Sequence, residues 1–183
     1  MPLLEESRRL ISVITDPLSK QVGIGSGGHL LVAEQQLVAS AFPVRAVLPS
    51  LYPEQLGSED FCRTHRLRFA YVGGSMARGI SSPQMVIALA RIGALGFYGT
   101  AGLPLKEMEA GLQYLQQHLS GDLLSWGANL IHSPSKPELE EETVDLFLKY
   151  QVRRVEASAF MDLQPSVVRY ACSGLRCAED GQV

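Results

Sequence analysis

The chain has 183 residues, of which 46% are hydrophobic and 19% are charged, and its formal net charge is −3. These values indicate an ordinary globular domain that is long enough to bury a substantial core. They exclude a basic footprint for nucleic acid, and no apolar run approaches the roughly 18 residues that a membrane span needs.

Residues 1–68 are the least regular part of the chain, and we expect an N-terminal extension of short strands and loops there. Two apolar runs, 11–14 and 29–33, each fit a strand. Pro17 and a glycine cluster separate the two runs and would break any helix. The first residues contain no signal-peptide core, so the cytoplasm is the expected compartment.

The glycine-rich stretch 23–28 fits the dinucleotide-binding pattern G-x-G-x-x-G in its letters. That pattern needs a buried strand directly before it and an acidic residue about 20 positions later, at the end of the next strand. Here Pro17 and Lys20 precede the glycines, and Val47-Leu48-Pro49 occupies the later position. We therefore interpret the stretch as a hairpin or a surface loop.

The most regular pattern of the chain lies in residues 69–99, which fit a strand, a glycine-containing turn, a helix and a second strand. The apolar run 69–72 ends at two glycines, as is typical of a strand buried on both faces. Ser82 fits a helix N-cap in front of a proline, and Gly93 fits a left-handed C-terminal cap. With a second buried strand at 95–98, the pattern predicts parallel strands joined by a right-handed crossover.

The alternation of strands and helices continues after this unit. Apolar residues three and four apart predict a helix from residue 105, and a third strand is expected at 126–131. Pro137 opens the next helix, whose first turns carry glutamates where the helix dipole favours negative charge, so the acidic run requires no metal. A fourth strand at 154–159 and a helix that starts at Pro165 complete the pattern.

Four strands that are each followed by a helix make half of a (β/α)₈ barrel, a fold that typically needs about 250 residues. We therefore expect an α/β chain in which residues 69–183 are the N-terminal half of a TIM barrel, and residues 51–65 hold a short helix that covers its N-terminal end or side. Three explanations stay open: a fragment of a longer protein, pairing with another chain, or a small open sheet. Exposed strand edges and an apolar interior would favour self-association into a homo-oligomer.

Several blocks of this region resemble the flavin-dependent nitronate monooxygenase (2-nitropropane dioxygenase) barrels, and more closely the PfaD-type enoyl reductase of polyunsaturated fatty acid synthases and trans-acting polyketide synthases. The resemblance covers residues 51–176. It is carried by Tyr52-Pro53, Gly57, Gly74-Ser75-Met76, Gly79-Ile80-Ser81-Ser82-Pro83, Gly93, Gly96-Phe97-Tyr98-Gly99, Asn129-Leu130-Ile131-His132-Ser133-Pro134, Glu138-Leu139-Glu140-Glu141 and Val152-Arg153-Arg154-Val155-Glu156-Ala157-Ser158-Ala159-Phe160-Met161.

The resemblance implies the N-terminal part of an FMN-dependent oxidoreductase. In the complete protein, hydride would pass from NADPH or NADH to FMN, and then to the β-carbon of an enoyl thioester carried on an acyl carrier protein. Two alternatives stay open, a catalytically inactive fragment that serves as an assembly or binding module, and a flavin oxidase of the nitronate monooxygenase type. Flavin absorbance of the purified protein separates an enzyme from an inert fragment.

The resemblance also implies which residues meet the cofactor, because the family's flavin lies across the carboxyl ends of the strands. By position, the backbone that touches the ring falls on Gly74, Ser75, Met76 and Ala77. The asparagine that ends the third strand corresponds to Asn129, and Ser158 is placed similarly in the fourth strand. Without the resemblance, Asn129 is a capping or turn amide. His132 is a candidate wall residue or proton donor, although a lone histidine in a loop is more often a polar surface residue.

Other parts of the expected site fall outside this segment. The flavin phosphate would rest on loops after strands seven and eight, and the family's catalytic histidine comes from a later strand, beyond Val183. No metal site is expected, because Cys62 and His65 lack a matching second pair of ligands. Cys172 and Cys177 add no paired spacing, so we expect the three cysteines to be reduced thiols.

A hydrolase is the rival enzyme, because Gly73-Gly74-Ser75-Met76-Ala77 nearly matches a nucleophile elbow. In an elbow, the helix begins directly after the serine, so that its first N–H groups serve the oxyanion. Here the helix start at Ser82-Pro83 comes seven residues after Ser75, so we reject the hydrolase.

Overall fold

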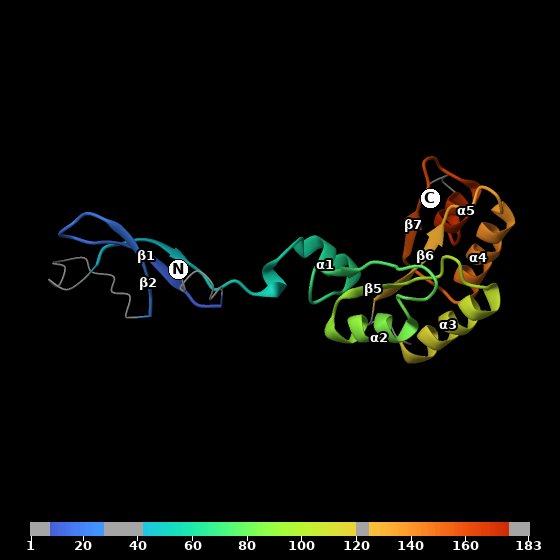
Figure 1. Cartoon of the computed structure of the whole chain (residues 1–183), viewed down its shortest axis with the longest axis horizontal. Helices are drawn as coiled ribbons and strands as arrows, with labels where there is room; N and C mark the ends of the chain where they lie inside the picture. Colours follow the sequence, from blue (N-terminus) through green and yellow to red (C-terminus); the bar gives the residue numbers. More distant parts are fainter. Residues whose placement is uncertain (1–7, 28–41, 120–124, 176–183) are drawn as a thin grey trace, which may run out of the picture. The chain divides into compact units, whose positions relative to one another are not determined.

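The structure is a computed structural model that describes residues 8–27, 42–119 and 125–175. The chain forms two compact units, Met1–Leu56 and Gly57–Val183, which are described separately below (Figure 1). The division falls before residues 57–68, which the sequence analysis grouped with the N-terminal extension. These residues belong to the second unit: the backbone N–H of Arg68, for example, donates to the carbonyl of Gly93 at 2.8 Å. In the described part of the chain, no helix combines the length and the apolar character needed to cross a bilayer.

The first unit is built on a three-stranded antiparallel sheet with the order β2-β1-β3. Its strands are β1 (Ile11–Thr15), β2 (Val22–Ser26) and β3 (Val44–Leu48). The predicted strand 11–14 is confirmed, and the glycine-rich stretch contributes to the second strand of a hairpin whose turn is held by the Leu18 N–H and the Asp16 carboxylate at 2.8 Å. The third strand was not predicted, and the expected strand 29–33 lies outside the described residues.

The second unit contains a four-stranded sheet with the order β4-β5-β6-β7, in which every neighbouring pair is parallel. The strands are β4 (Val72–Gly73), β5 (Leu95–Tyr98), β6 (Trp126–Ile131) and β7 (Val155–Ser158). Each strand is followed by a helix, as predicted from the alternating pattern. The unit is therefore a half barrel of the (β/α)₈ type.

The first of these strands is shorter than the apolar run 69–72 suggested. The backbone N–H groups of Arg68 and Phe69 both donate to the carbonyl of Gly93, at 2.8 and 3.0 Å, instead of to a strand neighbour. Sheet pairing begins only where the Leu95 N–H meets the Tyr71 carbonyl at 3.0 Å. The start of this segment is thus bound to Gly93, in the later connection between α2 (Pro83–Ile92) and β5.

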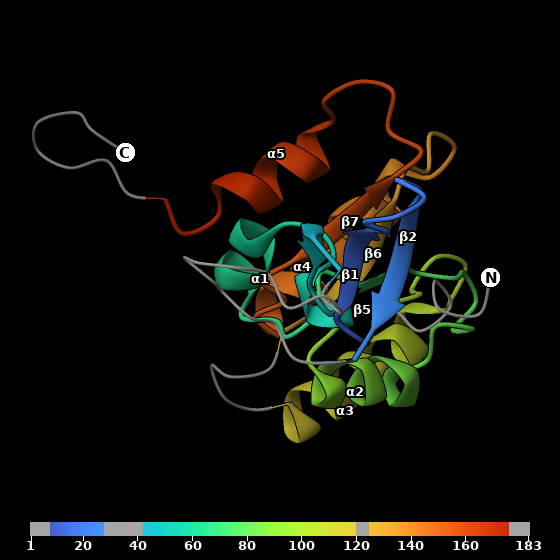
Figure 2. The same ribbon diagram turned by 90° about the vertical axis from the view of Figure 1, so that its left-hand side faces the viewer.

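Four helices follow one another along the outer face of this sheet (Figure 1). They are α2 (Pro83–Ile92), α3 (Leu105–His118), α4 (Pro137–Lys149) and α5 (Pro165–Cys172). Figure 2 shows α5 beside β7 and α2 with α3 toward β5. The predicted caps of α2 are present, since the Ser82 hydroxyl accepts from the Met85 N–H at 3.3 Å and Gly93 adopts φ 85°. Apolar residues of these helices pack on the strands, and Val86, Leu112, Val144 and Phe147 are among those fully buried.

A further helix, α1 (Glu59–His65), lies at the amino ends of the strands, as expected for a helix within 51–65. The Ser125 hydroxyl, just before β6, donates to the carbonyl of His65. Arg154, just before β7, donates from Nε to the His65 Nδ1 at 3.0 Å. Desolvation and the nearby Arg154 cation lower the pKa of His65. The helix α1 therefore contacts the segments that lead into β6 and β7, at the end opposite to the one where barrels of this type bind their ligands.

The two faces of the sheet have different neighbours. Ala128 and Leu130 pack with the helices in the buried core, and side chains alternate along a strand. Asn129 and Ile131 therefore face the inner side, away from the helices, as do Glu156 and Ser158 on the adjacent strand by its register with β6. The inner face is partly open, with Ile131 37% exposed.

Candidate functional site

The loop after β4 provides the first part of the candidate site, and its shape is fixed by Ser81. The Ser81 hydroxyl donates to the carbonyl of Gly74 at 3.0 Å and accepts from the Met76 N–H at 2.9 Å. Ser81 is 1% exposed, so these bonds are shielded from water. The loop therefore turns back on itself, and the backbone of residues 74–77 lies at the carboxyl edge of the sheet.

The same loop packs closely on the loop after β5. The Gly79 N–H donates to the Gly99 carbonyl at 2.9 Å, and the Gly99 N–H donates to the Ser81 carbonyl at 3.0 Å. A Cβ added at Gly99 would overlap the backbone carbonyl of Met76. Only glycine allows the two backbones to approach this closely.

Asn129 joins the third and fourth strands of the sheet on the inner face. Its Nδ2 donates to the Glu156 carbonyl at 2.9 Å and to the Ser158 hydroxyl at 2.7 Å. The Thr100 hydroxyl donates to the backbone carbonyl of Asn129, so the loop after β5 is bound to Asn129 as well. Asn129 is 3% exposed. Because both amide hydrogens are used within the protein, the side chain has only its oxygen to offer a ligand.

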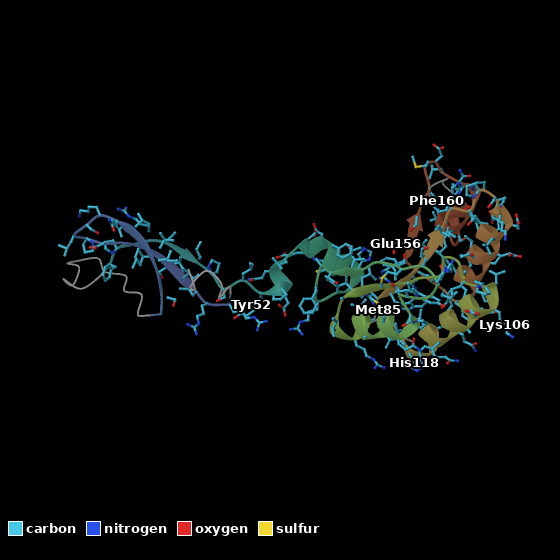
Figure 3. All side chains as sticks on the ribbon, viewed as in Figure 1. Tyr52, Met85, Lys106, His118, Glu156 and Phe160 are labelled. Carbon is cyan, nitrogen blue, oxygen red and sulfur yellow. The ribbon has the colours of Figure 1, made fainter. Side chains whose placement is uncertain are left out.

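Glu156 connects the two outermost strands of the sheet and was not among the predicted site residues. It comes from β7 (Figure 3), and its carboxylate Oε2 accepts from the Ser75 N–H at 2.8 Å. In a flat sheet, strands in the first and fourth positions would lie about 14 Å apart. The contact therefore requires a curved sheet, as in a barrel. The signal for Glu156 in the sequence was a charged residue in the middle of a short predicted strand.

His132 forms a separate cluster on the helix side. Its Nδ1 lies 2.8 Å from the Oε1 of Glu140, and its ring lies 5.0 Å from that of Phe160 between centroids. Glu140 is 5% exposed and also accepts from the Ser133 N–H at 2.6 Å and the Ser166 hydroxyl at 2.6 Å. Burial raises the pKa of Glu140, but these hydrogen bonds outweigh it and leave the pKa below its ordinary value.

This second cluster borders a hollow of about 450 Å³ between α4 and the start of α5. Its lining includes His132, Glu140, Gln164 and Ser166. The sequence analysis treated the acidic start of α4 as a response to the helix dipole and did not distinguish Glu140 from its neighbours. The sequence signal that it faces inward was its spacing from the apolar residues Val144 and Phe147, at i+4 and i+7 on the same helix face.

The structure thus brings three of the predicted site residues together and places a fourth, His132, in a separate cluster. Ser75, Asn129 and Ser158 belong to one network, connected through Glu156. The Met76 side chain is 42% exposed beside this network. His132 belongs instead to the cluster around Glu140. In the residues that the structure describes, no three His, Cys, Asp or Glu side chains gather as metal ligands.

The inner site is a polar rim at the carboxyl edge of the sheet. Its polar atoms are mainly acceptors, from Glu156 and the Asn129 oxygen, together with the backbone of the loop after β4. This set suits a ligand that has a hydrogen-bond donor at one edge. The fold defines the class of protein, a (β/α)-barrel, and barrels of this class bind ligands at the carboxyl ends of their strands, where this rim lies.

Comparisons with known proteins identify the relatives of this chain, although no family model matches it. The polyketide biosynthesis protein PksE of Bacillus subtilis is 42% identical over 139 residues, which are 76% of this chain and 18% of PksE. The polyketide biosynthesis protein ThaF of Burkholderia thailandensis is 38% identical over 74% of this chain and 11% of ThaF. A polyunsaturated fatty acid synthase polypeptide of Thraustochytrium sp. is 41% identical over 70% of this chain and 8% of that polypeptide.

A solved structure gives the same result. The enoyl reductase domain of MlnA, from the macrolactin biosynthesis cluster of Bacillus amyloliquefaciens, superposes with a TM-score of 0.65 at 37% identity, over 70% of this chain and 29% of that domain's chain. The chain is a homologue of the PfaD-type enoyl reductases of polyketide and polyunsaturated fatty acid synthases, and it corresponds to their N-terminal part. It spans less than a fifth of the curated relatives named above.

Proposed function

We propose that this chain supplies the N-terminal half of an FMN-dependent enoyl reductase that acts on an enoyl thioester carried by an acyl carrier protein. The observation that carries the proposal is the network at the carboxyl edge, in which Ser75, Asn129 and Ser158 come from separate βα units and meet on the inner face. The homology to an enoyl reductase domain supports the reaction class.

The residues present fit one edge of a flavin ring. The isoalloxazine ring has a single N–H donor beside two carbonyl acceptors, and the Asn129 oxygen is an acceptor whose position is fixed by the two bonds of its amide nitrogen. The glycine at position 74 leaves the backbone accessible, since a Cβ added there would meet only the Glu156 Oε1, at 3.6 Å. When bound, FMN would take hydride from NADPH or NADH and deliver it to the enoyl β-carbon.

The protein's share of this reaction is to position the cofactor and the substrate. Backbone of residues 74–77 would lie against the ring, Asn129 and Ser158 would fix its polar edge, and the packed loops after β4 and β5 would exclude water from that side. The phosphate grip and the proton donor are expected from later strands, as the resemblance implies.

The first test is a titration of the 183-residue chain with FMN, followed by flavin absorbance and fluorescence. We expect saturable binding that Asn129→Ala weakens at least tenfold, since a fixed polar contact is lost. Gln116→Ala, an exposed amide on α3, is the matched control and should bind as the original chain does. Equal binding by both variants would show that Asn129 does not contact the ring.

The second test measures the reaction. The half barrel replaces the corresponding segment of the MlnA enoyl reductase domain. NADPH oxidation is followed with an enoyl thioester on an acyl carrier protein, and oxygen consumption is followed separately with a nitronate in the absence of NADPH. Reduction of the thioester supports the proposal. Turnover of the nitronate alone would favour an oxidase, and a folded, colourless hybrid without activity would favour an assembly module.

A further inference from the structure

We propose that Glu156 is a positioning residue, whose carboxylate holds the loop after β4 in the shape that receives the flavin ring. The part that concerns the ring rests on the function proposed above. The part that concerns the loop is a property of the chain itself and can be tested without any ligand.

The contact between Glu156 and the loop is a charge-assisted bond to backbone. The Glu156 Oε2 accepts from the Ser75 N–H at 2.8 Å, and its Oε1 is 3.6 Å from the point where a Cβ on Gly74 would stand. An ionised carboxylate is an acceptor only, so it matches a backbone donor and binds it more strongly than a neutral oxygen does. Glu156 thus holds the residue at the centre of the predicted cofactor-contacting stretch.

The backbone of Glu156 is itself fixed, so its side chain can hold the loop after β4 in one position. Its carbonyl accepts from Asn129 at 2.9 Å, and its strand pairs with β6 through the register Asn129↔Glu156. A continuous path of bonds therefore runs from Ser158 through Asn129 and Glu156 to Ser75. Glu156, which was not predicted, thus connects the three predicted cofactor-contacting residues Ser75, Asn129 and Ser158.

The rest of the loop is held independently. Ser81 binds both the Gly74 carbonyl and the Met76 N–H, and the Gly79 N–H binds Gly99. Loss of the Glu156 carboxylate should therefore release the Ser75 amide selectively and leave the neighbouring Met76 amide protected. This selectivity distinguishes a positioning role from general destabilisation of the fold.

The experiment uses the 183-residue chain with Glu156→Ala and Glu156→Gln, and with Glu142→Ala as the control, an exposed glutamate on α4. Amide hydrogen exchange is measured residue by residue without ligand, and FMN affinity is measured by titration. We expect Ser75 to exchange about tenfold faster or more in the alanine variant, and less so in the glutamine variant, which keeps a neutral acceptor. The FMN dissociation constant should rise in the same order, and the control should change neither quantity.

Amides of α3 serve as an internal reference, since their unchanged protection shows that a variant is folded. Unchanged exchange at Ser75 in Glu156→Ala would overturn the inference. Faster exchange at Ser75 with unaltered FMN affinity would overturn its second half, because the held loop would then not matter to the ring. If the original chain binds no FMN at all, the proposed function fails for this chain, while the exchange data still decide whether Glu156 holds the loop.

Discussion

Replacement of Glu140 gives the most direct test of how the carboxyl end of the half barrel is held together. This carboxylate is 5% exposed and accepts from three donors, the Ser133 N–H, the Ser166 hydroxyl and His132. Glu140→Ala removes all three bonds. Ser166 is only 2% exposed, whereas His132 and Ser133 are partly exposed.

The expected loss follows from these exposures. One buried donor without a partner costs about 1–3 kcal/mol, and a net bond to a charged group contributes about 1.5 kcal/mol or more. We therefore expect Glu140→Ala to lower the free energy of unfolding by about 3 kcal/mol. Glu140→Gln should cost only about 1 kcal/mol, because one oxygen remains and the Ser166 hydroxyl can rotate to accept from the new amide.

The dependence on pH follows from the lowered pKa of Glu140. A carboxyl whose folded pKa lies below its unfolded value, about 4.3, contributes stability that is complete above the unfolded pKa. That contribution is lost as the pH falls through the folded pKa. The difference in stability between the original chain and Glu140→Gln should therefore shrink as the solution is acidified below about pH 4.

The assay is urea unfolding followed by circular dichroism at neutral and acidic pH, with Glu142→Ala as the control on the same helix. Replacement of that exposed glutamate should change the free energy of unfolding by less than about 0.5 kcal/mol. The reasoning would be refuted if Glu140→Ala unfolded at the same urea concentration as the control, or if its deficit were as large in acid as at neutral pH.

Three other substitutions have separate expected outcomes. Ser82→Ala should lower the unfolding free energy by about 1 kcal/mol, because the Met85 N–H loses its capping acceptor; an unchanged urea midpoint would contradict this. Gly99→Ala should lower the free energy of unfolding by about 2 kcal/mol or more, since the new Cβ overlaps the Met76 carbonyl. It should also increase amide exchange in the loop after β4. Gly23→Ala is the control that should be tolerated, because a Cβ there meets only one neighbouring atom, at 4.0 Å. Ala159→Gly should raise the free energy of unfolding by about 0.5 kcal/mol, and with it the thermal midpoint, because Ala159 adopts φ 63°, where an L side chain is strained. A lower midpoint would show that the strain is absent.

The helices and buried strands of the second unit could be predicted because their signals are local. Ser82 and Gly93 mark the start and the end of α2 through properties of single residues, and the structure places both caps as predicted. The first strand was predicted too long because the Phe69 N–H binds the carbonyl of Gly93 and not a neighbouring strand. That bond joins residues more than twenty positions apart and has no signature in the apolar run 69–72. Local patterns thus predict elements better than they predict which partner an edge segment chooses.

The candidate site was predicted only in part, for the same reason. The resemblance identified Asn129 and Ser158 as ends of adjacent strands, and the structure joins them at 2.7 Å. Whether they meet a flavin stays a prediction. Glu156 was missed because its partner, the Ser75 N–H, is 81 positions away in sequence and becomes a neighbour only when the sheet curves. Glu140 was missed although its signal was local, because the helix dipole already explained an acidic residue at that position.

The two glutamates that sequence reasoning missed perform the same physical task on opposite faces of one sheet. Each accepts a backbone N–H from a loop at the carboxyl end, Glu156 from Ser75 on the inner face and Glu140 from Ser133 on the helix side. A loop N–H at such an edge has no strand neighbour, and it must find an acceptor or water. A carboxylate anchored in a strand or helix meets that need and fixes the loop to a rigid element. Loops fixed in this way have their shape before any ligand binds, and such preorganisation is what the cofactor proposed above, which reacts at defined atoms, would require.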